Sequence, residues 1–417
     1  MHFFSRLRIT ELKLRRYNLF SGVAFCINPF VSLMFSAYYY FKGRDTSFFF
    51  ALSLALIFVY FPIMYDTSSN FFAQYYVKEN DVSNLYVVLP RVLRESYSIN
   101  YYSVVYLYTA IIFYCWLKTL YYNFSQSESS RRLLYLIFIA IFSLNYRDVM
   151  DLNRNCLAIA LTFYCILYLN VKYRKLKLLN SIVFLALSSS LHITALMVWG
   201  AYLVVTMMKL SRRKYIVILI SCSIVGFILP TVLQAFSGVI SSLDGPLGGR
   251  LSFYLFNSKF GVQVFTVSTA LKKFLNYIIL IGIAYLGVKY KKKNNSDKTV
   301  NVLLLLCSLA FLFSAYVTFF ERLVLCITFF YTYLFFKDND YKSAKKILLM
   351  LVVIRTLALD VTVYGPIFFG DYSDVLPDYD SKVDLELKPF YYPTPLLLDV
   401  DNGYSDKYLL INDKWDY

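Results

Sequence analysis

Long apolar runs recur along the chain from residue 19 to about residue 363, and only short polar connections separate them. A helix of about 20 apolar residues crosses the hydrocarbon core of a bilayer. The composition agrees, because 59% of the residues are hydrophobic and the mean hydropathy is +0.54. The pattern predicts an all-α polytopic membrane protein with about 11 to 13 transmembrane helices, not a soluble core.

The basic residues lie between the apolar runs and give the chain a net charge of +16. That charge would suit a nucleic-acid partner, but short clusters beside apolar runs are typical of topology determinants, so we exclude nucleic acid. Six connections hold 22 Lys and Arg, whereas the intervening connections hold eight. The bias predicts that the first set is cytoplasmic and the second lies outside. The first set comprises 42–44, 118–132, 172–177, 209–214, 289–298 and 337–346.

This topology divides the chain into three parts. We expect a basic N-terminal segment, a polytopic membrane domain with three outer loops, and an acidic, extended, periplasmic C-terminal tail. The ranges are 1–18 for the N-terminal segment, 19–363 for the domain, 66–100, 145–155 and 238–270 for the loops, and 364–417 for the tail. Basic residues before and after the first apolar run both favour the cytoplasm. A bent hairpin at Asn28-Pro29 would reconcile them, and the sequence leaves this open.

The stretch NYRDVMDLNRN (145–155) places charges between two apolar runs. A helix from Arg132 would rise only about 22 Å by Arg147, less than the roughly 30 Å core. Ionisable groups at such depth are costly and usually functional. In a continuous helix Arg147, Asp151 and Arg154 would share one face. Arg154 also begins the next run, where a helix N-terminus and a guanidinium favour an anion. The alternative is an Arg–Asp pair that merely closes a loop.

A second short segment holds a histidine. Only 31 residues separate Lys177 from Lys209, and two full crossings need about 40. The segment therefore predicts a hairpin that stops short of the outer surface, with His192 near its tip; one long tilted helix is the alternative. A histidine is well suited to move protons near neutral pH, although a structural, hydrogen-bonded histidine would fit the same position.

Further charged residues fall on the outer side of the predicted topology: Asp66, Arg91, Arg94, Glu95, Arg250, Glu321 and Arg322. Arg355 and Asp360 lie within the last apolar run, where they could pair with each other or line a cavity. The outer arginines oppose the charge bias, which indicates an anionic ligand. A lipid-linked diphosphate has its charges at the headgroup level and its tail in the bilayer.

The order of two motifs resembles a known family. NRNCLAIALTFYCILYL and, after a basic turn, FLALSSSLHITALMVW resemble the R-x-x-(L)A-x-A-x and (F)H-x-(S/T)A-L core of the Wzy/EpsG polysaccharide polymerases. FPIMYDTSSNFF with Asp66, Arg250 before Tyr254, and Arg322-Leu323 resemble other parts of those chains. The resemblance spans about residues 20–340.

The resemblance implies a GT-C-like membrane glycosyltransferase, an O-antigen or capsule polymerase of the bacterial inner membrane. Such enzymes join undecaprenyl-diphosphate-linked repeat units on the periplasmic face, with a chain-length regulator and a flippase in the same pathway. It implies that the diphosphate is bound by arginines, here Arg154, Arg147, Arg250 and Arg322. His192 or a carboxylate, with Asp66, Asp148 and Asp151 as candidates, would activate the acceptor hydroxyl. Arginines can neutralise the leaving group without metal, so we expect no metal and no other cofactor, although Asp66 in the first large outer loop leaves a divalent cation open.

Two other functions remain open. A lipid-linked oligosaccharide flippase would also have about twelve spans and a cationic cavity, but we expect its charges deep in both halves. A membrane O-acyltransferase would also use a histidine, but beside the first spans.

Overall fold

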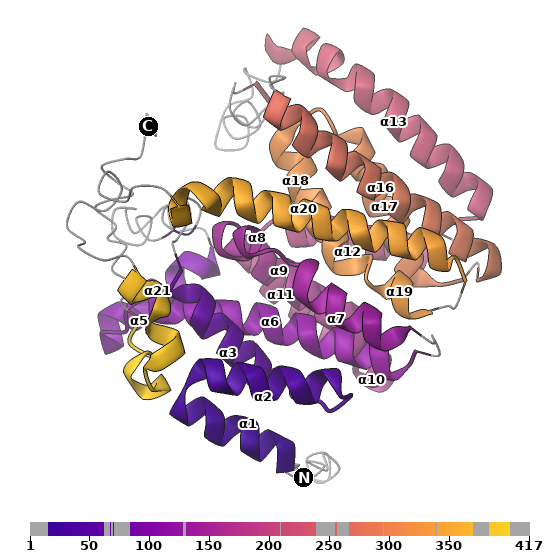
Figure 1. The fold of residues 1–417 in the computed structure, drawn as a ribbon. Coiled ribbons are helices and arrows are strands. Elements are labelled where there is room, and N and C mark those ends of the chain that lie inside the picture. Colours follow the sequence, from indigo (N-terminus) through magenta and orange to yellow (C-terminus); the bar gives the residue numbers. More distant parts are fainter. Residues whose placement is uncertain are drawn as a thin grey trace, which may run out of the picture. The chain divides into compact units, whose positions relative to one another are not determined.

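A computed structural model describes residues 16–61, 67, 70, 84–127, 131–208, 210–238, 255–256, 267–294, 296–337, 340–369 and 383–400. The regular structure of these residues is helical (Figure 1), which confirms the predicted all-α polytopic membrane protein. Within this part of the chain, five helices are long and apolar enough to cross a membrane: Tyr101–Ser125, Asn153–Lys172, Arg212–Ala235, Lys273–Lys292 and Val317–Lys337. Other apolar helices are shorter, so the count of 11 to 13 spans stays a prediction.

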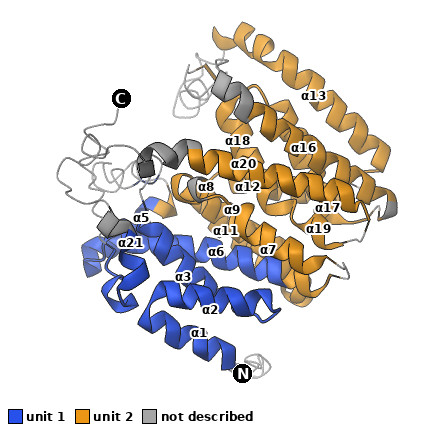
Figure 2. Cartoon of the chain, in the orientation of Figure 1, with its two compact units in different colours: residues 1–82, 87–121, 371–417 blue, residues 83–86, 122–370 orange. Residues whose placement is uncertain are grey.

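The chain divides into two compact units (Figure 2). Unit 1 comprises residues 1–82, 87–121 and 371–417, and unit 2 comprises residues 83–86 and 122–370. In unit 1 the described helices are α1 (Arg16–Ile27), α2 (Pro29–Phe41), α3 (Ser47–Val59), α5 (Leu85–Tyr97), most of α6 (Tyr101–Ser125), α21 (Val383–Tyr391) and a 3₁₀ turn, η5 (Thr394–Leu396).

The first apolar run of unit 1 is a helical hairpin. Asn28 is extended, and its side-chain oxygen accepts hydrogen bonds from the first N–H groups of α2 at Phe30 and Val31. Pro29 occupies the first helical position, where its missing N–H costs nothing. α1 and α2 pack against each other. The hairpin that the sequence left open is therefore present, and it brings Arg16 and the 42–44 cluster to the same end of unit 1.

That end of unit 1 holds the basic cluster and Lys118 together. Lys118 pairs with Asp45, and Tyr121 donates a hydrogen bond to the carbonyl of Gly43 at 2.7 Å. Nearby, the Tyr40 hydroxyl donates to the carbonyl of Leu117 at 2.7 Å. These contacts join two connections that the charge bias assigns to the cytoplasmic side, so the fold of unit 1 agrees with the predicted topology.

The opposite end of unit 1 binds part of the acidic C-terminal segment. The Asn28 amide donates to the carbonyls of Pro389 at 3.2 Å and Tyr392 at 2.8 Å, and the Tyr60 hydroxyl donates to Leu397 at 3.0 Å. Leu397 and Val400 are buried. The prediction of an extended tail from residue 364 is thus wrong for two parts. Residues 364–369 continue α20, and residues 383–400 belong to unit 1, where these hydrogen bonds and the buried Leu397 and Val400 hold them.

Unit 2 contains the candidate site. Its described elements are α7 (Arg132–Phe142), α8 (Tyr146–Asp151), α9 (Asn153–Tyr164), a π-helical turn η3 (Cys165–Leu169), α10 (Asn170–Lys172), a 3₁₀ turn η4 (Arg174–Leu176), α11 (Lys177–Leu191), α12 (Thr194–Met207), α13 (Arg212–Ala235), α16 (Val267–Lys293), α17 (Lys298–Leu312), α18 (Val317–Phe330), α19 (Tyr333–Lys337) and α20 (Lys342–Phe369). Buried side chains line nearly the whole of α9, whereas α13 keeps most of its apolar surface exposed, as a lipid-facing helix does.

α11 and α12 form the short hairpin that the segment length predicts. They have 15 and 14 residues, fewer than the roughly 20 that a full crossing needs. His192 interrupts the helical backbone with φ −158° and ψ 140°. Both helices pack against α9. The prediction of a hairpin with His192 at its tip is therefore confirmed, and one long tilted helix is excluded.

The basic connections of unit 2 meet at one end. The hydroxyl of Ser127 donates to the carbonyl of Phe336 at 2.6 Å, and that of Tyr333 donates to Asp297 at 2.9 Å. The rings of Tyr122 and Tyr168 meet there too, with centroids 5.3 Å apart. Arg154 lies 18 positions before Lys172, which corresponds to about 27 Å along a helix. The start of α9 is therefore far from the basic end of the unit.

Candidate functional site

The first element of the candidate site is the broken helix of the NYRDVMDLNRN stretch. The side chain of Asn145 caps α8 by accepting the N–H of Asp148 at 2.7 Å. α8 ends at Asp151, and Leu152 departs from helical geometry, with ψ 34°, before α9 begins. The expectation of one continuous helical face is therefore wrong. The side chain of Arg147 lies outside the described residues, and Asp151 is half-buried.

Arg154 occupies the second position of α9, as the sequence predicts. Leu152, which precedes the helix, contributes no side-chain cap. The first N–H groups of a helix carry partial positive charge and need acceptors. The Nε of Arg154 is buried and has no hydrogen-bond partner among the described residues. The start of α9 thus combines a guanidinium with the positive end of a helix, an arrangement suited to an anion.

His192 is bonded to the start of α12 and linked to the start of α9. Its Nδ1 accepts the backbone N–H of Thr194 at 3.1 Å and lies 2.9 Å from the Thr194 hydroxyl oxygen. That hydroxyl also contacts the side-chain oxygen of Asn155 at 3.2 Å. Asn155 is fully buried and follows Arg154 directly. A short hydrogen-bonded path therefore joins the tip of the hairpin to the N-terminus of α9.

Arg322 completes the group from a third element, α18. α18 packs against both α9 and α12. The charges of Arg154 and Arg322 both act on the imidazole of His192. The charges of Arg322, Asp148 and Asp151 likewise all act on Cys156. The structure thus brings His192, Arg154 and Arg322 together from three separate parts of the sequence, with Asp151 in the same region. Their roles in binding and catalysis stay predictions.

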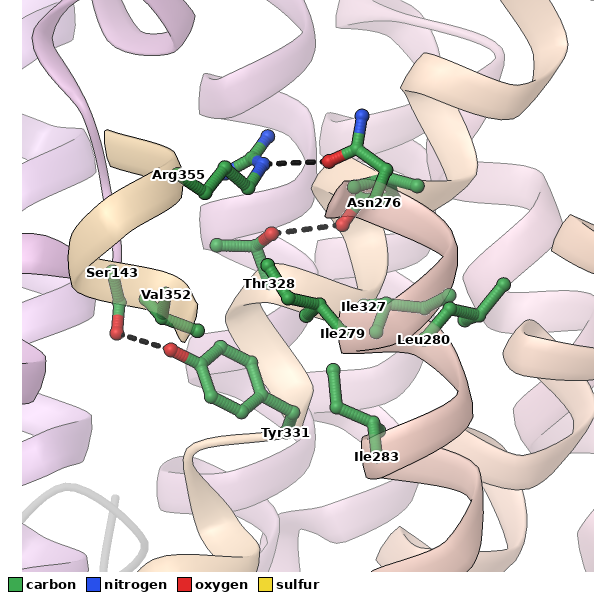
Figure 3. Close-up of a pocket in the computed structure, with 11 residues that line it drawn as sticks. Ser143, Asn276, Ile279, Leu280, Ile283, Ile327, Thr328, Tyr331, Val352 and Arg355 are labelled. Carbon is green, nitrogen blue, oxygen red and sulfur yellow. Dashed lines mark hydrogen bonds between the residues drawn. The ribbon is translucent and has the colours of Figure 1, made fainter. Parts of the chain in front are cut away.

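A buried ion pair lies beside this group. Asp148 is 5% exposed, and one of its oxygens lies 3.5 Å from the guanidinium of Arg355. The Nε of Arg355 donates to the side-chain oxygen of Asn276 at 2.7 Å, as Figure 3 shows. The Asp148–Arg355 bridge ties α8 to α20, and Asn276 extends it to α16. The sequence suggested Asp360 as the partner of Arg355; the charges of Arg355 and Asp148 act on Asp360, but the ion pair is with Asp148.

Arg355 also lines a small cavity with Asn276, Ser143 and Tyr331 (Figure 3). Ser143 and Tyr331 share a hydrogen bond of 2.5 Å across it. Its volume of about 20 Å³ has room for about one water molecule. This cavity is thus too small for a sugar, and the polar groups that line it serve the packing of α7, α16, α18 and α20.

The remaining predicted site residues, Asp66 and Arg250, lie outside the described residues. Among the residues that the structure does describe, no three His, Cys, Asp or Glu side chains gather as a metal site would require. Thr194 and Asn155 were missed by the sequence analysis. The only signal was their position, two residues after His192 and one after Arg154.

A comparison with protein-family models matches residues 60–373 to the model of the EpsG family. The match covers most of the chain and includes every described residue of the site. No curated protein and no solved structure matches the chain significantly.

Proposed function

Because the chain belongs to the EpsG family, we propose that it joins oligosaccharide repeat units carried on undecaprenyl diphosphate into a surface polysaccharide. The family supports a polymerase-like role in polysaccharide synthesis by a multi-pass membrane protein. The repeat-unit donor, the outer (periplasmic) location of the reaction and the individual residues are our proposal.

The observation that carries the proposal is the convergence of Arg154, His192 and Arg322. In the reaction, a hydroxyl of the acceptor sugar attacks the anomeric carbon of the donor. The bond from that carbon to the diphosphate breaks, and undecaprenyl diphosphate leaves with the negative charge. Hydrogen-bond donors and cations fixed in a low-dielectric site stabilise such a leaving group, and guanidiniums suit phosphate oxygens geometrically.

The proton of the attacking hydroxyl must go to a base. Asp151 is our candidate base, because it ends α8 and its charge acts on Cys156 together with that of Arg322. The family resemblance adds three residues to the proposed site. Asp66 is a second candidate base, and Arg147 and Arg250 are further candidate ligands of the diphosphate. The chemistry needs no metal, since the leaving group would be neutralised by arginines.

The charge pattern supports a reaction on the outer side of the cytoplasmic membrane. The basic connections at 125–132, 293–298 and 333–342 meet at one end of unit 2, and basic connections favour the cytoplasm. Arg154 lies at the start of α9, at the end of its helical segment that is far from these basic connections. Membrane lipid would hold the undecaprenyl tail. A flippase that delivers the units and a chain-length regulator are the expected partners.

The test uses a bacterial host that makes the cognate lipid-linked repeat unit but lacks its own polymerase. Wild-type protein should convert single repeats into a ladder of polysaccharide on a gel. Arg154→Ala, at an equal membrane level, should leave single repeats. If wild type yields no ladder and the host accumulates units on the cytoplasmic side in its absence, the protein is a flippase and the proposal is wrong.

A further inference from the structure

The hydrogen bonds of His192 determine which of its ring nitrogens carries the proton. A backbone N–H can only donate, and the N–H of Thr194 points at Nδ1 from 3.1 Å. Nδ1 must therefore supply a lone pair, and in a neutral imidazole the proton is then on Nε2. A second proton at Nδ1 would face the Thr194 N–H and break this hydrogen bond.

An imidazole in this form has a donor, not a lone pair, at its outer nitrogen. Nε2 makes no hydrogen bond to the residues that the structure describes, and His192 is only partly buried. The two charges that act on the ring are the guanidiniums of Arg154 and Arg322. A donor near two cations suits an anionic oxygen. It does not suit the abstraction of a proton from a hydroxyl.

We propose that His192 donates its Nε2–H to a diphosphate oxygen of the lipid-linked donor, and that Thr194 and Asn155 are positioning residues for it. This inference rests on the proposed function. The acceptor proton then goes to a carboxylate, with Asp151 the described candidate, while the electron pair of the broken glycosidic bond leaves on the diphosphate. His192 neither gains nor loses a proton in this step; its hydrogen bond strengthens as negative charge develops.

Thr194 and Asn155 act by fixing the distance between His192 and Arg154. The Thr194 hydroxyl has one proton and two neighbouring acceptors, Nδ1 at 2.9 Å and the Asn155 oxygen at 3.2 Å. It thus joins the hairpin tip to the residue that follows Arg154. Displacement of a donor by about 1 Å can lower a rate by about a hundredfold, so loss of this link should lower turnover more than substrate affinity.

The same geometry has a purely structural explanation, because Nδ1 caps the first turn of α12. The explanations differ in the side chain that replaces histidine. Gln presents an amide near the position of Nε2, can donate there, and cannot act as a base. Asn presents an oxygen near the position of Nδ1 and is among the best helix caps, but it has nothing at the Nε2 position.

The experiment measures undecaprenyl diphosphate release by purified His192→Gln, His192→Asn and His192→Ala in lipid vesicles that contain the lipid-linked repeat unit. We expect His192→Gln to retain turnover within about tenfold of wild type, and the Asn and Ala variants to lose about 10²- to 10³-fold. Equal loss in all three variants would assign the base role to His192. Full turnover in the Asn variant would show that His192 serves only as the N-terminal cap of α12. Either result overturns the inference.

A second pair of variants tests the positioning residues without changing the histidine. Thr194→Val removes the hydroxyl and keeps the shape, so turnover should fall about 10-fold or more at unchanged KM, whereas Thr194→Ser should stay within about threefold of wild type. Thr206→Val makes the same change on the exposed face of α12 and should behave as wild type. Wild-type turnover in Thr194→Val overturns the positioning role even where the His192 variants fail to accumulate.

Failure of this inference is distinguishable from failure of the proposed function. If wild-type protein releases no undecaprenyl diphosphate, the polymerase proposal itself falls. If wild type is active and the Gln variant is as inactive as Ala, only the donor role falls.

Discussion

Two helical hairpins each turn on one polar residue, Asn28 between α1 and α2 and His192 between α11 and α12, and they use these residues differently. Asn28 is buried, and its amide makes four hydrogen bonds: two from N–H groups of α2 and two to carbonyls of the C-terminal segment. That is the full capacity of an asparagine side chain. His192 bonds through Nδ1 alone, and its Nε2 has no hydrogen bond within the described part of the chain.

Two arginines of unit 2 show the same difference. Arg355 is 9% exposed and is bonded to Asn276 and paired with Asp148. Arg154 has a buried Nε with no hydrogen-bond partner among the described residues. Burying an unbonded polar group costs about 1–3 kcal/mol. A protein can tolerate this cost where a bound ligand supplies the missing hydrogen-bond partner. A polar group with partners inside the protein, such as Arg355, therefore suits a structural role, and a buried one without a partner, such as the Nε of Arg154, suits a binding role.

The largest expected effect is the loss of stability on replacing Arg355, the arginine with partners inside the protein. Arg355→Gln removes the ion-pair partner of the buried Asp148, and breaking a buried pair destabilises a protein by about 3–5 kcal/mol. We expect a clearly lower melting temperature of the purified protein in detergent. The double variant Asp148→Asn/Arg355→Gln should recover part of the loss. A melting temperature equal to that of wild type would show that the contacts of Arg355 with Asp148 and Asn276 do not stabilise the protein.

The next largest effect is the loss of activity on replacing Arg154, whose Nε has no partner among the described residues. Arg154→Ala should reduce polymerisation by about 10²- to 10³-fold, as loss of one preorganised donor to a developing charge does, with an unchanged melting temperature. Turnover and thermal unfolding are measured on the same preparation. Arg174→Ala, in the exposed 3₁₀ turn η4 that follows the far end of this helical segment, is the matched control and should remain active. Unfolding of Arg154→Ala would make Arg154 structural and break the comparison.

Asn28→Ala should act on stability alone. It removes two cap bonds and two bonds to the C-terminal segment, and at about 1 kcal/mol for the cap and a similar amount for the other bonds we expect a loss of about 2–3 kcal/mol. Turnover per folded molecule should stay within about twofold of wild type. Asn28→Asp keeps the cap acceptor and should lose less. A large loss of turnover at full stability would assign the first hairpin to the site.

The smallest effect lies inside the functional hairpin. The buried Nε1–H of Trp199 on α12 donates to the hydroxyl of Ser188 on α11 at 3.1 Å. Ser188→Ala leaves that donor unpaired, at a cost of about 1–2 kcal/mol. We expect a small decrease in melting temperature with turnover unchanged. If Ser188→Ala reduced turnover as strongly as His192→Ala, the hairpin would work as one unit, and single groups could not be separated by their hydrogen bonds.

Much of this arrangement follows from the sequence. Segment lengths between basic clusters predict the α11–α12 hairpin, because 31 residues cannot cross a bilayer twice. The apolar run that follows Arg154 predicts that this residue begins a helix. Charge alternation also predicts that the connection at 42–44 lies near Lys118, and the Lys118–Asp45 pair agrees.

The remaining features depend on long-range packing, which local patterns do not contain. No periodicity indicates that Arg355 pairs with Asp148, more than 200 positions away, and not with the nearby Asp360. The helix break at Leu152 has no Gly or Pro to announce it. The link from Thr194 to Asn155 joins two helices that are distant in sequence. The C-terminal segment packs through buried apolar residues that its acidic composition conceals.

The most direct test of the central claim counts the undecaprenyl diphosphate released for each repeat unit joined. Purified wild-type protein in vesicles of defined lipid receives the lipid-linked repeat unit, and released lipid and polymer length are measured together. Our account predicts one undecaprenyl diphosphate per new linkage with wild type, and neither release nor polymer with the Arg154→Ala/Arg322→Ala double variant at full stability. Polymer formed by that double variant at the wild-type rate would contradict the proposed site, and no release with wild type would contradict the proposed function.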